Sequence, residues 1–349
     1  MPRLLQERLE PLLEFKKIKG VDNLTEDNTR LPPGFFRVCS NVDIDSEEMA
    51  HRRKGILQLL ISGASHSLWS DEGSLCFAVV NGNLVQINTD WTLTTLLNQV
   101  GASWINYVKV VDRVFFGNLT LVGYIKDANA YAFPEPTRIE RQKMVGGELI
   151  EFYNGAFWAA QGGVIYSSIP GRPFETDRKK LFLPVGGPIT MLKAVDDGLY
   201  VSAGDKVAFF QGPNILSLKY HHKLDVPALR GSPLTIERLD LGSKGVPMTH
   251  HGLVGKAILF HTSIGVFMGL KGGYVKDCTS DHYAEYDLVE GSSVMKWYNG
   301  YRQYVYMGRT AGPITIGGSA LLPPIVGTGG EVTIGEAVYL PSFTGTGEI

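Results

Sequence analysis

A hairpin pattern that recurs along the chain constrains its fold more than any other feature. Residues 195–212 predict a turn, a strand, a tight turn at Gly204-Asp205 and a second strand rich in alternating and β-branched residues. Gly and Asp tolerate the positive φ that a tight hairpin turn demands. A lone hairpin is marginally stable in water, so this pattern builds a fold only if it is repeated.

Five more copies of the pattern follow the same order of turn and strand. They lie at 73–87, 112–125, 154–166, 255–267 and 299–308, the last two in a looser form. Their first strands begin near Leu75, Val114, Phe157, Leu199, Ala257 and Gln303, at spacings of 39, 43, 42, 58 and 46 residues. A period of roughly 40 to 50 residues with about four strands in each unit is typical of β-propeller blades.

The repeats therefore predict an all-β fold, a β-propeller-like array of about five to six blades over residues 56–310. A β-sandwich or another β-array is the alternative, since the dipeptides of the better-known propeller families are absent. Glycine makes up 41 of 349 residues, above the usual roughly 7%, as many tight turns require. The 58-residue step indicates an insertion, which we expect at 229–246. An N-terminal arm (1–55) and a C-terminal tail (311–349) flank the array.

Composition excludes several classes of protein. The formal net charge is −2, from 33 basic and 35 acidic side chains, so overall electrostatics favour neither nucleic acid nor a membrane surface as a partner. Cys39, Cys76 and Cys278 are odd in number and lack a Cys-x-x-Cys spacing, which favours buried thiols over disulfides or a metal site. No stretch approaches the roughly 18 apolar residues of a membrane span, and the first residues lack the apolar core of a signal peptide. We expect synthesis and folding in a cytoplasm.

The tail contains a repeat of 18 residues. Leu322-Pro323 recurs 18 residues later as Leu340-Pro341, and Gly-Thr-Gly at 327–329 recurs at 345–347. Glutamate is the only charged residue in the repeat, and one copy is too small to bury a core. A flexible linker is the simple interpretation. Recurring Val, Ile, Tyr and Phe favour short strands that contact other subunits, with Leu322, Pro323, Leu340 and Pro341 as contact residues.

The arm carries the motif that is most specific in the chain. After Gly20-Val-Asp-Asn come a Leu-Pro-Pro-Gly step, an Asn-Val-Asp strand and a pair of arginines before a glycine. This run resembles the opening of a group of tailed-bacteriophage virion proteins, the tail hub or nozzle (tail-accessory) and fibre-base type, whose body is β-propeller-like. Residues 46–50 stand where the group has a glycine. The resemblance assigns assembly roles to Leu31, Pro32, Pro33, Gly34, Asn41, Asp43, Arg52, Arg53 and Gly55.

The resemblance implies a structural function in the virion. The protein would be a tail component, made in the host bacterial cytoplasm, that connects tail parts or gates the DNA conduit. Its partners would be other tail or connector proteins, further copies of itself in a trimer or hexamer, and DNA in the conduit. A carbohydrate-binding receptor-recognition module at the tail tip is the alternative, and a glycan depolymerase is a more remote one.

The sequence predicts no enzyme, no cofactor and no metal. His221-His222 and His250-His251 are pairs of neighbours, and on a strand the two side chains of each pair point to opposite faces. The two histidines of a pair therefore cannot bind the same metal ion. The acidic loop at 277–287 lacks the ligand order of an EF-hand, which leaves calcium as an alternative only. The basic cluster at 51–54 is typical of the solvent-exposed face of a hairpin, and phosphate binding is the alternative interpretation.

Three further sets of residues have both a structural and a functional interpretation. Carboxylates that could line a central channel also stabilise turns, which is their commoner role: Asp112, Asp196, Asp197 and Asp287. The tryptophans could form a sugar-binding platform, but packing between blades is favoured: Trp69, Trp91, Trp104, Trp158 and Trp297. Residues 35–44 are expected to close the ring by pairing with the unit at 294–307.

Overall fold

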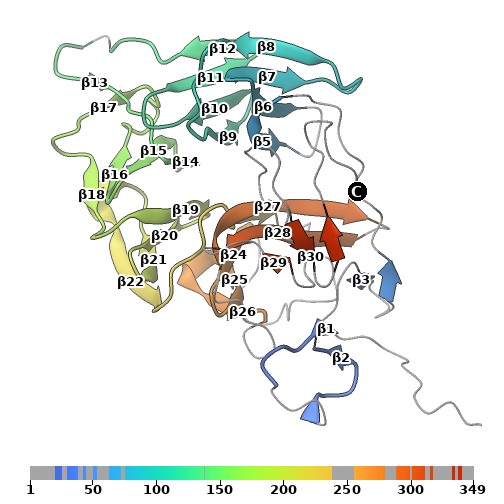
Figure 1. Ribbon diagram of the computed structural model, residues 1–349. Helices are drawn as coiled ribbons and strands as arrows, with labels where there is room; N and C mark the ends of the chain where they lie inside the picture. The colour runs from blue at the N-terminus through green and yellow to red at the C-terminus, as the bar shows by residue number, and fades with distance from the viewer. Residues whose placement is uncertain are drawn as a thin grey trace, which may run out of the picture.

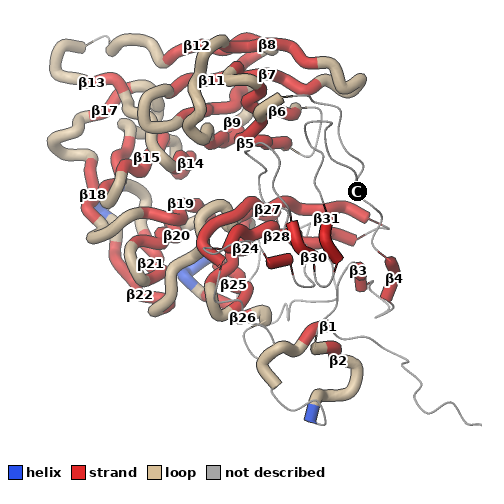
Figure 2. Tube along the Cα trace, in the orientation of Figure 1, coloured by secondary structure: helices blue, strands red, loops and turns tan. Residues whose placement is uncertain are grey.

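A computed structural model of the chain shows an all-β protein (Figure 1). The structure describes residues 20–25, 30–37, 42–44, 50–52, 63–71, 75–136, 138–237, 255–279, 288–298, 301–310, 315–316, 332–334 and 337–339. Helical structure in these ranges is limited to short 3-10 turns such as Ile215–Ser217 and Lys271–Gly273, drawn in blue in Figure 2. No helix in the described part is long and apolar enough to span a membrane.

Five four-stranded antiparallel sheets, here called blades 1 to 5, follow one another around an arc (Figure 1). Each blade takes its strands in chain order. Blade 1 consists of β5 (Ser65–Ser70), β6 (Cys76–Val80), β7 (Asn83–Ile87) and β8 (Leu93–Leu97), and blade 2 of β9 (Asn106–Val110), β10 (Arg113–Gly117), β11 (Val122–Lys126) and β12 (Asn129–Ala132). Blade 3 consists of β14 (Leu149–Tyr153), β15 (Ala156–Gln161), β16 (Val164–Ser167) and β18 (Phe182–Pro184), and blade 4 of β19 (Ile189–Val195), β20 (Gly198–Ala203), β21 (Lys206–Gln211) and β22 (Lys219–Leu224). Blade 5 consists of β23 (Leu234–Glu237), β24 (Lys256–Thr262), β25 (Gly265–Gly269) and β26 (Val275–Asp277).

The second strand of every blade is the most buried, because it is paired on both edges and covered on both faces. Along β15, Phe157 and Ala159 belong to the core cluster shared with blade 2, whereas Trp158 and Ala160 belong to the cluster shared with blade 4. Alternate side chains point to opposite faces of a strand, so a strand between two blades must be apolar at every position. This explains why these strands appear in the sequence as continuous apolar runs. The propeller-like all-β fold is therefore confirmed.

The predicted hairpin turns lie where the sequence places them. Asn81 and Gly82 join β6 to β7 with φ of 51° and 74°. Gly204 joins β20 to β21 with φ of 62°, a left-handed conformation that costs glycine little. Two-residue turns of this hand match the right-handed twist of the strands that they connect.

The sixth repeat differs from the other five. Residues 301–308 of this repeat belong to β28 (Tyr301–Thr310), which pairs antiparallel with β27 (Leu288–Tyr298), and this sheet has two strands in the described part of the chain. We call it the half-blade. The insertion expected at 229–246 was placed too early, because β23 occupies part of that range. The extra residues, 238–255, lie between the first and second strands of blade 5, where blade 4 has a two-residue turn.

The expected ring closure by residues 35–44 is not found among the described residues. There β2 (Phe35–Phe36) pairs in parallel with β1 (Gly20–Val21), and β3 (Val42–Ile44) pairs with β4 (Ala50–Arg52). The arm therefore pairs with itself rather than with the half-blade. In the tail, β29 (Thr315–Ile316), β30 (Val332–Ile334) and β31 (Ala337–Tyr339) form a separate sheet.

Candidate functional site

The near face of the half-blade packs on blade 5. Cross-strand partners Met295 and Tyr304 lie against the core cluster that contains Ile236, Leu259 and Met268. The Tyr304 hydroxyl donates a hydrogen bond of 2.7 Å to the backbone carbonyl of Ser232. Burial is the main cause that raises the pKa of Tyr304, so the phenol stays protonated and keeps this bond. The near face is thus an ordinary blade-to-blade contact.

The far face of the half-blade is exposed. The cross-strand pairs Ser292–Met307 and Val294–Val305 point to this face, where Val294 is 54% and Met307 38% exposed. Glu290 and Arg309 flank them with an ion pair of 2.7 Å. The equivalent face of every complete blade is apolar and covered by the next blade. Exposed apolar side chains beside a charged pair make this face a candidate interaction surface.

The outer edge of β28 pairs with no other strand among the described residues. In each of the five blades the second strand pairs with a first and a third strand, as β24 does with β23 and β25. β28 occupies this second position but pairs with β27 alone within the described residues. An edge of this kind, on a strand of 10 residues, is where a further strand from the same chain or from another molecule can add to a sheet.

Blade 1 does not offer a bare matching face for the half-blade. In a closed ring the far side of blade 1 would pack against the last blade. Four apolar side chains on that side are already buried, with exposures of 3–6%: Ala78, Val80, Val85 and Ile87. Direct closure of the ring would have to displace whatever covers them. Among the described residues, blade 1 therefore offers no exposed apolar face to the half-blade.

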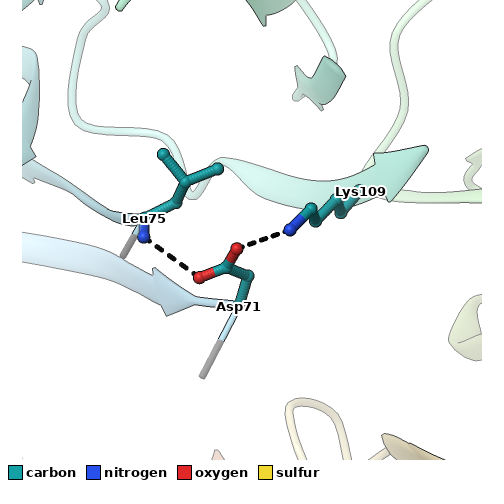
Figure 3. A network of polar contacts seen from close by, with 3 residues as sticks. All are labelled: Asp71, Leu75 and Lys109. Carbon is teal, nitrogen blue, oxygen red and sulfur yellow. Dashed lines mark hydrogen bonds and ion pairs between the residues drawn. The ribbon is translucent and has the colours of Figure 1, made fainter. Parts of the chain in front are cut away.

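Ion pairs link the first strands of neighbouring blades. Lys109 on β9 donates to Asp71, which follows β5, at 2.6 Å, while the same carboxylate accepts the Leu75 N–H at 3.0 Å (Figure 3). Lys193 on β19 lies 3.7 Å from Glu151 on β14. Because these charges are paired across blades, they fasten blades together rather than form a reactive site. Sequence reasoning missed them, since their partners are more than 35 residues apart.

A second charged link joins distant parts of the chain. Arg230, in the connection between blades 4 and 5, lies 3.5 Å from Glu148, which precedes β14. The carbonyl of Arg230 also accepts the Gly291 N–H of the half-blade at 2.8 Å. One residue of the connection between blades 4 and 5 is thus tied both to the start of blade 3 and to the half-blade.

The aspartates considered as channel residues stabilise turns instead. Asp112 lies in the β9–β10 turn, where its pair with Lys126 at 2.8 Å holds its pKa below the ordinary value. Asp197 accepts the Gly272 N–H at 3.1 Å and the Gln211 amide at 3.2 Å, and Asp196 accepts the Lys256 N–H at 3.4 Å. The two therefore lock the β19–β20 turn of blade 4 to blade 5. Asp287 lies outside the described residues.

The histidines and tryptophans divide between surface and core. His221 and His222 are exposed on β22, and His222 pairs with Asp225 at 3.0 Å. Trp158 is fully buried and Trp69 stacks against both Phe77 and Tyr107, but Trp91 and Trp104 are 64% and 52% exposed. Packing between blades, the favoured interpretation, is therefore wrong for Trp91 and Trp104, and buried Trp158 cannot belong to a surface platform. His250, His251, most of the acidic loop and the Trp297 side chain lie outside the described residues, and no metal-binding group of acidic, His and Cys side chains occurs among the rest.

The arm motif folds locally where it is described. The Pro32 carbonyl accepts the Phe35 N–H at 3.1 Å, and Gly34 has φ of 92°. This turn delivers β2 to β1, so Leu31, Pro32, Pro33 and Gly34 shape the arm. Asp43 lies opposite His51, and Arg52 opposite Val42, in the β3–β4 pair. The remaining predicted residues are outside the described part: Asn41, Arg53, Gly55, Leu322, Pro323, Leu340 and Pro341.

No family model and no curated protein matches the chain. Among solved structures, a streptogramin B lyase aligns with a TM-score of 0.40 and 10% identity over 63% of this chain and 70% of its own. Hsv2 of Kluyveromyces lactis aligns with a TM-score of 0.41 and 10% identity, over 74% of this chain and 80% of its own. The WD40 β-propeller domain of Doa1 aligns with a TM-score of 0.41 and 13% identity, over 70% of this chain and 82% of its own. At this level of similarity, no activity transfers to this chain.

Proposed function

We propose that the protein is a structural subunit of a bacteriophage tail, which assembles into a symmetric homo-oligomer through its half-blade. The main support for this proposal is the exposed far face of β27–β28, where Val294 is 54% and Met307 38% exposed. The resemblance of the arm to tail hub and fibre-base proteins supplies the setting. The tail repeat supports further contacts between subunits.

The half-blade suits association physically. Burying an exposed valine or methionine yields roughly 1.5–3 kcal/mol for each side chain. A symmetric ring presents the same patch from every copy, so a modest gain is multiplied around the ring. Strand addition at β28 would satisfy backbone groups in water-excluded surroundings, which gives register as well as affinity.

The first test is the mass of the full-length protein by sedimentation velocity. We expect a trimer or hexamer. Val294→Glu should weaken association about 100-fold, because a charge buried without a partner costs several kcal/mol. Leu216→Glu is the matched control, since Leu216 is 73% exposed on a different surface. A monomeric wild-type protein, or a Val294→Glu oligomer of unchanged stability, would refute assembly through the half-blade.

The virion setting needs a separate test. Antibodies raised against the purified protein should label the tails of intact particles from the phage that carries its gene. A chain ending at Gly312 should assemble less completely if the tail repeat contributes contacts. Absence of the protein from purified particles would rule out the virion role while leaving the oligomer result intact.

A further inference from the structure

A hollow between blades 2 and 3 is independent of the half-blade. Its volume is about 320 Å³, and its wall is made by one residue of β10 and by the loop that leads to β17 (Glu175–Thr176). The lining residues are Arg113, Gly171, Arg172, Pro173, Phe174 and Glu175. This volume is at the lower end for ligand sites, which limits the occupant to about one ring.

Two guanidinium groups supply the polar part of the wall. The ion pair of Arg113 with Asp112 is long, at 3.8 Å from Nε, and within the described residues the terminal nitrogens of Arg113 make no hydrogen bond. Arg172 reaches Glu175 at 3.4 Å through one terminal nitrogen, which leaves its other N–H groups unpaired in the described part. A planar guanidinium with free N–H groups is suited to bidentate binding of a carboxylate.

Aromatic rings fix one of these groups and supply the apolar part. The Arg113 guanidinium lies over the Tyr124 ring, 5.1 Å from its centroid. Tyr124 in turn stacks on Tyr131 at 5.2 Å and meets Phe174 at 5.4 Å. Phe174 is anchored in the core cluster of Phe115 and Phe133, so the wall is rigid. A preorganised cation loses little freedom on binding.

We propose that this hollow binds one carboxylate-bearing sugar ring, such as a uronic acid residue of a polysaccharide. The carboxylate pairs with Arg172 and Arg113, and the apolar face of the ring lies on Phe174 and Pro173. A saccharide suits the site better than an acidic peptide, because Phe174 and Pro173 offer apolar faces on which a sugar ring can lie. Glu175 restricts the site to a ligand that presents its hydroxyl groups on that side, as hydrogen-bond donors.

The test is calorimetric titration of the full-length protein with methyl β-glucuronide and with methyl β-glucoside, in which a neutral hydroxymethyl group replaces the carboxylate. We expect the glucuronide to bind at least about tenfold more tightly, in line with one charge-assisted contact, and to weaken as salt rises. Arg172→Gln should lose this preference. Arg178→Gln, a neighbouring exposed arginine that is absent from the wall, should keep it.

Several outcomes would overturn the proposal. One is equal or no binding of the two sugars, and another is an unchanged preference in Arg172→Gln. Binding of N-acetylglutamate amide as tightly as the glucuronide would assign the hollow to a carboxylate without a sugar. Arg113→Gln also removes the contact with Tyr124, so the thermal unfolding of this variant is first compared with that of the wild-type protein. If Arg113→Gln is unstable, the binding result for Arg172→Gln decides the test.

Discussion

The imidazole of His261 stacks on the phenol ring of Tyr306, with centroids 5.0 Å apart and planes 25° apart. His261 is on β24 of blade 5 and Tyr306 is on the near face of β28, so this pair forms part of the seam that holds the half-blade. His261 is only 3% exposed. Its backbone N–H donates to the buried Ser232 hydroxyl at 3.1 Å. The seam therefore contains a titratable group inside an apolar contact.

Acid should open this seam. Burial lowers the pKa of His261 from its ordinary 6.5, and a backbone hydrogen bond with Thr262 opposes this only in part. The unfolded chain takes up a proton near pH 6.5 while the folded chain does not, so stability falls as pH drops from 6.5 to the folded pKa and levels below it. Thermal unfolding from pH 8 to 4 should show this loss. His261→Gln should flatten the profile over that window.

His66 complicates the same experiment and provides its control. Burial also lowers the pKa of His66, in blade 1, so His66→Gln should remove a separate part of the slope. Only His261→Gln should change the pH dependence of hydrogen exchange in residues 288–310. Equal exchange profiles in the two variants would contradict a role for His261 in the seam.

A buried hydroxyl between blades 4 and 5 should be needed for stability. Ser202 is fully buried on β20, accepts the Ala228 N–H at 2.9 Å and bonds to the Thr190 hydroxyl at 2.8 Å. Ser202→Ala leaves the Ala228 N–H without a partner, which costs about 1–3 kcal/mol in urea unfolding. Ser217→Ala, which removes an exposed hydroxyl, is the control and should change stability by less than about 0.5 kcal/mol.

The sequence was sufficient for the repeated part of the fold because its signals are local. Each tight turn and each continuous apolar run, such as β20, is specified by residues within one hairpin. The sequence predicts a further blade at the half-blade, because the second strand of the half-blade has the same hydrophobic pattern as the second strands of the five complete blades. What distinguishes it is the set of strands that pair with β28, and this depends on distant segments that carry no local signal.

The candidate sites were less predictable for the same reason. Aspartates in turns were correctly given a structural alternative, since a turn is local. The pairs Lys109–Asp71 and Arg230–Glu148 join residues from different blades, and the hollow brings Arg113 beside Arg172. Such contacts follow from the angle at which blades pack, which hydrophobic periodicity does not encode. Exposure of Trp91 and Trp104 likewise follows from their position outside the blade contacts.

The two partners in the Asp71–Lys109 pair should contribute unequally. The Asp71 side chain is 7% exposed and accepts the Leu75 N–H as well, whereas Lys109 is 45% exposed. Asp71→Ala removes both contacts and should cost about 1–3 kcal/mol. Lys109→Gln removes a solvent-screened charge and should cost at most about 1 kcal/mol. Urea unfolding of both variants checks this order, and a larger loss for Lys109→Gln would contradict it.

Gly231 should control how the half-blade docks on blade 5. Its φ is 79°, and a Cβ at this position would meet the backbone carbonyl of Gly291 on β27. Gly231→Ala adds left-handed strain of about 1–2 kcal/mol and separates the two backbones, so amides in residues 288–310 should exchange faster while blades 1 to 4 keep their protection. Gly204 has a similar φ of 62° and open space around it, so Gly204→Ala should add the backbone strain without weakening the docking of the half-blade. Hydrogen exchange followed by mass spectrometry separates the cases: equal protection of 288–310 in the two variants would mean that Gly231 is not a docking position.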